Sequence, residues 1–270
     1  MAVRPLTFLS DYGAGEFAGV CRAVIARIAP EAPVIDLTHA IARHDVRQGA
    51  AALVNALPFA PAGVHLAVVD PGVGTSRRAV AIRVADSDRA LVGPDNGLLW
   101  PAVARLGGAV EAADISLSPA RLEPVSATFH GRDIFAPVAA RLALGAALAD
   151  LGEPFDPAGL TELVSRPPAL EPGAELRAEV AYVDGFGNAA LVATAADAAD
   201  AGLRLGRPVA IEVAGRAHHA AYALTFADLE PGGVLVYLNA SGALAVAVNR
   251  ESAAERLGIA GGDTVVLRPR

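Results

Sequence analysis

The stretch LTFLSDYGAGEFAGVCRAVIARI, residues 6–28, decides the fold class. It opens with Leu6–Leu9, a short apolar run that is typical of a buried strand. Ser10, Asp11 and a glycine-rich turn follow, and the pattern over Glu16–Ile28 predicts a helix. A strand, a polar turn and a helix in this order form the repeating unit of α/β proteins.

The same alternation continues through the first half of the chain. It predicts an α/β fold with an N-terminal layered domain whose sheet is largely parallel. Polar residues come directly after three of the predicted strands, at Ser10-Asp11, Thr38-His39 and Asp70-Pro71. Ligands bind at these carboxyl ends in open α/β sheets, so we expect the functional site there. Further strands are predicted over Val34–Leu37, His65–Val69 and Val80–Val84, and further helices over Val46–Leu57 and Ile134–Leu148.

The composition changes near residue 152, where prolines and glycines become frequent. We expect an α/β domain over residues 1–165, a proline-rich linker over 166–173 and a smaller β-domain over 174–270. Short apolar runs separated by turn residues predict that this second domain is antiparallel and forms a partial barrel. The runs are Leu176–Val183, Ala190–Ala193, Val209–Val213, Val234–Leu238, Leu244–Val248 and Thr264–Leu267.

The overall composition excludes several functional classes. With 53% hydrophobic and 19% charged residues, the chain is not disordered, and no apolar run reaches the roughly 18 residues that a membrane span needs. The net charge of −7 argues against nucleic acid as a partner. The sequence has no lysine, which excludes a P-loop or a Schiff-base lysine. Cys21 is the only cysteine, and no apolar signal core begins the sequence, so we expect a cytoplasmic protein without disulfides.

Two carboxylates at predicted strand ends are candidates for chemistry. Asp11 can accept hydrogen bonds from the hydroxyls of a ribose, or it can simply cap the turn. Asp70 precedes Arg77 by seven residues across a glycine-rich loop, which can fold back and bring the arginine to the carboxylate. Such a pair keeps an aspartate ionised, although it can also be a purely structural salt bridge.

Two further loops carry unusual residues. His130 lies at a loop-to-helix junction, away from an apolar stripe, which favours a site residue over a core histidine; Asp133 is a plausible N-cap for the following helix. The segment Asp184-Gly185-Phe186-Gly187-Asn188 lies between two strands. A hairpin turn explains its Asp-Gly pair but not Phe186 and Asn188, which suit the face and the edge of a nucleobase.

A divalent-metal site is the rival interpretation of the acidic and histidine residues. The residue types are suitable for it, but the spacing Asp36-Leu37-Thr38-His39 matches no local ligand motif. We therefore expect no metal and no cofactor. The residues concerned are Asp36, His39, His44, Asp45 and Asp133.

Seven segments, spread nearly from end to end of the chain, form a recognisable series when taken in order. They are Leu9-Ser10-Asp11-Tyr12-Gly13, Asp36-Leu37-Thr38-His39, Val69-Asp70-Pro71-Gly72-Val73-Gly74-Thr75, Gly93-Pro94-Asp95-Asn96-Gly97-Leu98, Phe129-His130-Gly131-Arg132-Asp133, Asp184-Gly185-Phe186-Gly187-Asn188 and Ala245-Val246-Ala247-Val248-Asn249. Together they resemble the S-adenosylmethionine hydroxide adenosyltransferase family, which is related to the fluorinases and chlorinases.

The resemblance implies hydrolysis of S-adenosylmethionine to adenosine and methionine by a homotrimer whose active sites are shared between subunits. It implies that Asp70, Arg77 and His130 position and activate water and that Asp11 binds the ribose. Ala240, Ala245, Ser10 and Glu16 depart from the family pattern. Further substrate contacts are implied for Asp184 at the methionine end, for Phe186, Asn188 and the backbone of Val248 at the adenine, and for Ser241.

The implied reaction displaces a sulfonium that is already a good leaving group, so the difficulty is to align and activate water. Asp70 or His130 could be the general base. Three other functions stay open at this point: halide attack on the same substrate, binding of adenosine or S-adenosylmethionine without catalysis, and metal-dependent hydrolysis. A halide is disfavoured beside Asp70, because the carboxylate would repel it.

Overall fold

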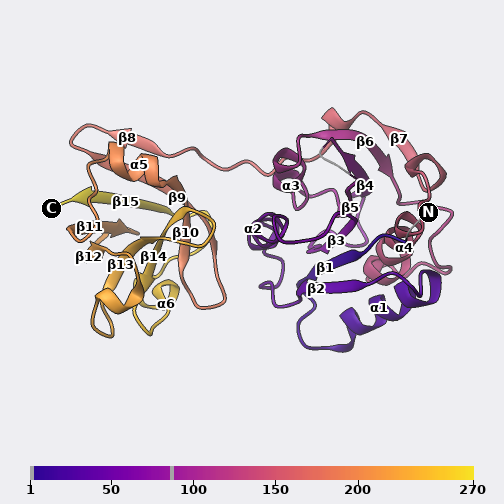
Figure 1. Ribbon diagram of the computed structural model, residues 1–270, viewed down its shortest axis with the longest axis horizontal. Helices are drawn as coiled ribbons and strands as arrows, with labels where there is room; N and C mark the ends of the chain where they lie inside the picture. The colour runs from indigo at the N-terminus through magenta and orange to yellow at the C-terminus, as the bar shows by residue number, and fades with distance from the viewer. Residues whose placement is uncertain (1–2, 86–87) are drawn as a thin grey trace. The chain divides into compact units, whose positions relative to one another are not determined.

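The computed structural model describes residues 3–85 and 88–270, and the chain divides into two compact units, Met1–Leu163 and Val164–Arg270. Each unit has its own sheet (Figure 1). Each also has its own hydrophobic core. The first unit contains, in chain order, β1 (Leu6–Ser10), α1 (Glu16–Ile28), β2 (Val34–Thr38), α2 (Val46–Ala56), β3 (Val64–Val68), β4 (Ala79–Val84), β5 (Ala90–Pro94), α3 (Trp100–Arg105), β6 (Ala109–Asp114), the π-helix η1 (Gly131–Phe135), α4 (Ala136–Ala143), the 3-10 helix η2 (Leu148–Asp150), β7 (Glu153–Phe155) and the 3-10 helix η3 (Pro157–Gly159).

The sheet of the first unit has the order β2-β1-β3-β5-β4-β6-β7 among the described residues. The neighbours β2, β1, β3 and β5 are parallel, whereas β4, β6 and β7 each pair antiparallel with the strand before them in this order. Every residue of β1, β3 and β5 is buried, as expected for central strands covered on both faces. The predicted α/β fold with a largely parallel sheet is confirmed.

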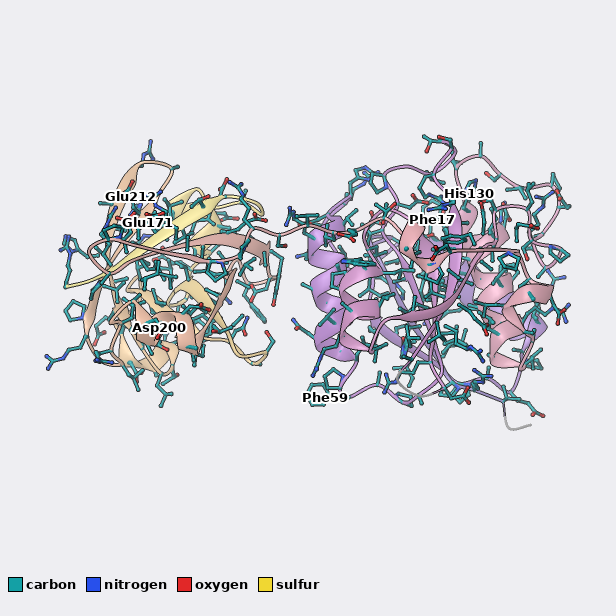
Figure 2. All side chains as sticks on the ribbon, turned by 90° about the horizontal axis from the view of Figure 1, so that it is seen from above. Phe17, Phe59, His130, Glu171, Asp200 and Glu212 are labelled. Carbon is teal, nitrogen blue, oxygen red and sulfur yellow. The ribbon has the colours of Figure 1, made fainter. Side chains whose placement is uncertain are left out.

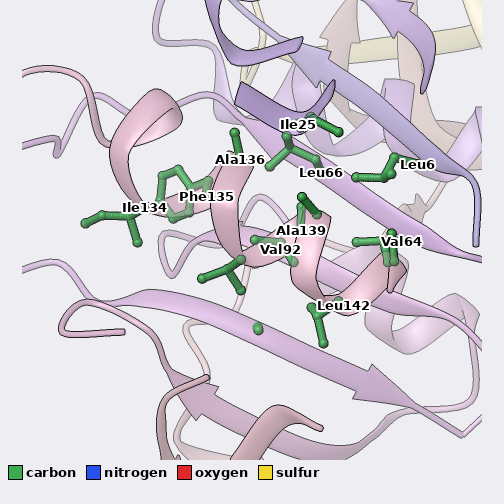
Figure 3. Close-up of a cluster of buried hydrophobic side chains, with 14 of the residues drawn as sticks. Leu6, Ile25, Val64, Leu66, Val92, Ile134, Phe135, Ala136, Ala139 and Leu142 are labelled. Carbon is green, nitrogen blue, oxygen red and sulfur yellow. The ribbon is translucent and has the colours of Figure 1, made fainter. Parts of the chain in front are cut away.

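Two layers of helices cover this sheet. On one face α1 and α4 pack on Leu6, Leu66 and neighbouring side chains, as Figure 3 shows. On the other face α2 and α3 pack on Leu9 and Val69. The predicted helix α1 has the expected bounds, because its buried residues recur at the spacing of one helical face. These residues are Ala18, Cys21, Val24 and Ile25.

The predicted helix over Ile134–Leu148 differs from the structure at both ends. The helical turn starts earlier, as the π-helix η1, and α4 ends at Ala143, two residues before Gly145 with its positive φ of 93°. Asp133 therefore lies inside the helical segment, and its prediction as an N-cap is wrong. Its buried carboxylate instead accepts from the Arg132 side chain and from the Ser126 backbone.

The second unit is a β-barrel. Its elements are β8 (Ala169–Glu171), β9 (Glu175–Val183), β10 (Ala189–Thr194), α5 (Ala195–Asp200), β11 (Pro208–Val213), β12 (Arg216–Tyr222), the 3-10 helix η4 (Phe226–Asp228), β13 (Val234–Leu238), β14 (Ala243–Val248), α6 (Ala253–Leu257) and β15 (Thr264–Pro269). The order β10-β14-β13-β12-β11-β15-β9 closes on itself through the β9–β10 pairing, so the barrel is complete rather than partial. All its pairings except β12–β13 are antiparallel.

The proline-rich segment predicted as a linker over 166–173 contains a short strand. Residues 169–171 form β8, which pairs with β9, and the Arg166 side chain binds the carboxylate of Glu179. The structure thus counts these residues with the second unit, which begins at Val164. Within the described ranges, no helix has the length and apolar character needed to cross a membrane.

Candidate active site

Three loops meet at the carboxyl edge of the first sheet. Asp11 directly follows β1, Asp70 lies two residues beyond β3, and Asn96 lies two residues beyond β5. The Asn96 side chain donates to the carbonyl of Val69 at 2.9 Å, which ties the loop after β5 to the end of β3. The edge that the sequence indicates for ligand binding is therefore the place where the candidate side chains converge.

Arg77 donates two hydrogen bonds to Asp70. Its Nε donates to Oδ1 at 3.1 Å and its Nη2 to Oδ2 at 2.5 Å. Both side chains are more than nine-tenths buried, with 8% and 6% of their surface exposed. The loop folds back at Gly74, whose φ is +78° and where a Cβ would lie 2.4 Å from the Ala127 carbonyl oxygen. The predicted approach of Arg77 to Asp70 is confirmed.

The same arginine reaches His130. Nη2 of Arg77 lies 3.1 Å from Nδ1 of His130, which caps the π-helix η1. A guanidinium can only donate, so Nδ1 accepts and the proton of the neutral imidazole is on Nε2. At the next residue, Gly131, a Cβ would lie 1.9 Å from the hydroxyl oxygen of Tyr12, so only glycine allows this close approach.

Burial governs the protonation of both groups. It raises the pKa of Asp70 above its ordinary value, an effect larger than the opposing influence of Arg77. Burial and the Arg77 charge together lower the pKa of His130. At neutral pH the histidine is therefore neutral, and the aspartate is a stronger base than an exposed carboxylate would be.

Arg77 has a further donor at this site. Among the described residues, its buried Nη1 has no hydrogen-bond partner. The guanidinium carbon lies 5.4 Å from the centre of the ring of Phe135, the last residue of η1, and this contact helps to hold the group in place. The arginine therefore bridges Asp70 and His130 and retains a donor for a ligand or a water molecule.

Arg77 and His130 also line an open cavity of about 640 Å³ in the first unit. It extends over the start of β4 and the end of β6, which lie at the same edge of the sheet. Its other lining residues include Ser116, Arg121 and Glu123. Arg77 and His130 are thus accessible to small molecules from this cavity.

The loop after β1 places Asp11 and an aromatic cluster beside the group formed by Asp70, Arg77 and His130. Oδ2 of Asp11 accepts from the backbone N–H of His44 at 3.0 Å. Tyr12 is close enough to Asp11 and Asp70 for both carboxylates to raise its pKa, in addition to the larger effect of burial. The rings of Tyr12, Phe17 and Phe129 pack against each other, and Figure 2 shows Phe17 near His130.

The remaining predicted site residues belong to the second unit. Oδ1 of Asp184 accepts from the backbone N–H groups of Phe186 and Asn188, and Oδ2 accepts from the Asn188 side chain. The hairpin therefore holds Asp184 and Asn188 together and leaves the residue Phe186 84% exposed. Ser241 binds the Asn239 side chain in the turn after β13, and Val248 is buried at the end of β14.

Comparison with known proteins assigns the family. Residues 6–152 match the SAM hydroxide adenosyltransferase N-terminal domain, and residues 178–266 match the C-terminal domain of the same family. The chain belongs to the SAM hydroxide adenosyltransferase family. The resemblance seen in the seven sequence segments is confirmed.

Members of this family from several bacteria align over almost the whole chain. An (R)-S-adenosyl-L-methionine hydrolase of Salinispora tropica is 48% identical over 268 residues, covering 97% of both chains. A fluorinase of Actinoplanes sp. is 26% identical, covering 97% of this chain and 96% of its own. The crystal structure of an uncharacterized conserved protein from Thermotoga maritima superposes with a TM-score of 0.86 and 36% identity, covering 97% of this chain and 99% of that one.

Four of the five residues in the rival metal interpretation have other side-chain partners. Asp36 forms an ion pair with Arg22, and Asp45 caps α2 by accepting from the Gln48 backbone. His39 bonds to Ser10, and Asp133 is paired with Arg132. No group of three or more His, Cys, Asp and Glu side chains suited to a metal ion occurs in the part of the chain that the structure describes.

Two aromatic residues near Asp184 escape prediction from the sequence. Asp184 and Tyr182 add to the effect of burial in raising the pKa of Tyr237 to about 12, which places Tyr237 close to the hairpin loop. The Phe226 ring packs on Tyr237 with centroids 5.0 Å apart. Both residues lie far from the loop in sequence and in no recognisable motif, so only the barrel pairing brings them there.

Proposed function

We propose that this chain hydrolyses S-adenosyl-L-methionine to adenosine and L-methionine by attack of water at the ribose 5′ carbon. The observation that carries the proposal is the buried Arg77 side chain, which contacts Asp70 on one side and His130 on the other. The near full-length similarity to proteins named (R)-S-adenosyl-L-methionine hydrolase supports it.

In this mechanism Asp70 is the general base. The raised pKa of its carboxylate makes it a better proton acceptor, while Arg77 fixes its orientation. Nδ1 of His130 is occupied by the arginine donor, so His130 presents Nε2–H to the water oxygen and holds it in place. Water loses a proton to Asp70 as the new C5′–O bond forms and the C5′–S bond breaks. The electron pair of that bond stays on sulfur, which leaves as the neutral thioether of methionine.

Substrate binding is divided between the two units. Asp11 accepts hydrogen bonds from the ribose hydroxyls. It has acceptor capacity for them, because each carboxylate oxygen has two lone pairs and the His44 N–H occupies one of the four. Asp184 binds at the methionine end, Phe186 and Asn188 bind the adenine with the backbone of Val248, and Ser241 adds a contact. The exposed Phe186 ring and the fixed Asn188 amide support these roles.

The two sets of residues are combined in a homotrimer, with each site completed by a neighbouring subunit. The test mixes two inactive variants, Asp70→Ala and Asn188→Ala. Subunit exchange should restore some activity, because some sites then receive both intact halves. Exchange without recovered activity, or a fully active monomer in sedimentation, would contradict shared sites.

The reaction as written uses protein groups and water only, so no metal or cofactor is included. We place the enzyme in the cytoplasm, with no nucleic-acid or membrane partner. Activity should survive exhaustive chelation. Loss on chelation with recovery on adding Zn²⁺ or Mg²⁺ would return the metal interpretation to first place.

Chromatography of the products tests the function itself. Incubation of the pure protein with S-adenosylmethionine in chloride or fluoride buffer should yield adenosine and methionine in equal amounts. A 5′-halo nucleoside would identify a halogenase, and tight binding without turnover would identify a binding module. Either result would overturn the proposal.

A further inference from the structure

The segment after β2 holds the loop of Asp11 through three separate contacts. Oγ of Ser10 lies 2.7 Å from Nδ1 of His39, the backbone N–H of Gly13 donates to the His39 carbonyl at 2.7 Å, and the His44 N–H donates to Asp11. These contacts surround Asp11 on both sides along the chain. The loop that contains Asp11, the residue expected to bind ribose, is thus held mainly by one residue, His39.

The His39 ring is itself firmly held. The buried ring of Phe8 packs edge-on against it with centroids 4.7 Å apart. Nε2 lies 3.2 Å from Oδ1 of Asp36 without the alignment of a hydrogen bond, and Arg22 donates to the other oxygen of Asp36 at 2.5 Å. The imidazole therefore has one orientation, in which Nδ1 faces Ser10.

An irregularity in the strand pairing creates this arrangement. Phe8 pairs with Asp36 and Leu9 with Thr38, so β2 contains one extra residue at this point. Bulges of this kind re-aim side chains next to functional sites. Here the shift brings His39 level with Ser10, the residue directly before Asp11.

Ser10, His39 and Asp36 have the residue types of a hydrolytic Ser-His-Asp triad, but their surroundings exclude that role. Ser10 is 0% exposed, and its hydroxyl also accepts from the Tyr12 backbone at 3.3 Å. A nucleophile must reach the substrate, whereas this hydroxyl is enclosed between a strand and a turn. Its bonds instead fix the backbone on either side of Asp11.

We propose that His39 is a positioning residue, which acts through Ser10 and its own carbonyl to hold the Asp11 carboxylate in the orientation that accepts the ribose hydroxyls. The inference rests on the proposed function, in which Asp11 binds ribose. It predicts that a change at His39 weakens binding of the ribose hydroxyls specifically, rather than binding or folding in general.

The test uses calorimetry on the full chain to measure one ratio, the dissociation constant of 2′-deoxyadenosine divided by that of adenosine. His39→Ala should lower this ratio about fivefold relative to the unaltered protein, the equivalent of about one hydrogen bond. In turnover assays with S-adenosylmethionine, KM should rise while kcat changes less than twofold, because ribose binding is shared by ground and transition states.

Two further variants separate positioning from folding. His39→Asn puts an amide where Nδ1 of the imidazole stands and should restore most of the ratio. The matched control is His65→Ala, which breaks the analogous bond from Thr7 of β1 to His65 of β3 and should leave the ratio unchanged. Ser10→Ala, a smaller change, should lower the ratio in the same direction as His39→Ala.

The outcomes distinguish this inference from the proposed function. A folded His39→Ala protein with an unchanged ratio would overturn the positioning role, and so would an equal fall in His65→Ala. An unaltered protein that binds both nucleosides equally, or an Asp11→Ala variant with the full ratio, would instead contradict the assignment of Asp11 to ribose.

Discussion

β1 carries two bonds between a hydroxyl and an imidazole, three residues apart. Near its amino end, Thr7 bonds to His65 at 2.8 Å; at its carboxyl end, Ser10 bonds to His39 at 2.7 Å. His65 is fully buried, and Arg89 lies against its other nitrogen at 3.3 Å. The His39 side chain keeps 15% of its surface exposed and is followed by the loop that binds Asp11.

The same chemical pair therefore serves two purposes at the two ends of one strand. At the amino edge, burial lowers the pKa of His65 to about 4, so the ring is neutral and fastens β1 to β3. At the carboxyl edge, polar groups of the loops remain within reach of a ligand. The lesson is that the end of the strand, rather than the residue type, separates structural from functional histidines in this sheet.

The largest expected effect is at the carboxyl edge. Asp70→Asn keeps the size of the side chain but removes the base, so kcat should fall by about 10² to 10⁴ with little change in KM. The measurement is steady-state kinetics with S-adenosylmethionine. The matched control is Asp95→Asn, which breaks the neighbouring ion pair with Arg78. An equal loss of kcat in both variants would mean that Asp70 is only structural.

The next effect tests the amino edge. Because the pKa of His65 is about 4 in the folded chain and 6.5 ordinarily, its contribution is complete above pH 6.5 and is lost as the pH falls toward 4. The full difference corresponds to about 3 kcal/mol of unfolding free energy. Urea unfolding followed by fluorescence of Trp100, the only tryptophan, reports on the first unit. The loss between pH 7 and 4 should be about 3 kcal/mol smaller in His65→Asn; equal losses would contradict the buried neutral ring.

The pH dependence of catalysis sharpens the comparison. Activity requires an ionised Asp70, whose pKa is raised, and a neutral His130, whose pKa is lowered. Both conditions are met at neutral pH and fail on acidification. The value of kcat/KM should therefore be constant above about pH 6.5. It should decrease at lower pH, as the pH approaches the range in which carboxylates are protonated. A profile that instead rises as the pH falls from 7 to 5 would exclude Asp70 as the base.

The smallest effect compares the two hydroxyls directly. Thr7→Val and Ser10→Ala should each lower the unfolding free energy by about 1 kcal/mol, the usual value of one hydrogen bond. Only Ser10→Ala should also raise KM, by a few fold, because only that hydroxyl lies beside Asp11. Equal KM values in both variants would show that the carboxyl-edge pair has no special role.

Much of the architecture follows from local patterns. The buried runs that become β1 and β3, and the face spacing of α1, are visible in the sequence because burial imposes them. The strand β12, Arg216–Tyr222, is invisible because its sequence RAHHAAY has no apolar alternation and depends on pairing with β11. The π-helical start before α4 is likewise set by packing, where Gly131 meets Tyr12.

The part of the site that can be predicted from the sequence is the contact formed across a short loop. The six residues between Asp70 and Arg77, two of them glycines, are enough to predict their contact. The bond from Arg77 to His130 spans 53 residues, and the bond from Ser10 to His39 spans 29 and depends on a shift in strand register. Such contacts require the assembled sheet. The position of His130 at a loop-to-helix junction marks it as a site residue, but only the family resemblance groups it with Asp70 and Arg77.

The most direct test of the central claim, that the Asp70–Arg77–His130 group activates water for attack at the 5′ carbon, is turnover in water enriched in ¹⁸O. Mass spectrometry should find one ¹⁸O atom in the 5′-hydroxyl of every adenosine formed and none in methionine. Asp70→Asn should slow the appearance of the labelled adenosine by the same factor as kcat. Adenosine without the label, or label in methionine, would contradict direct attack by water and with it the role given to the three residues.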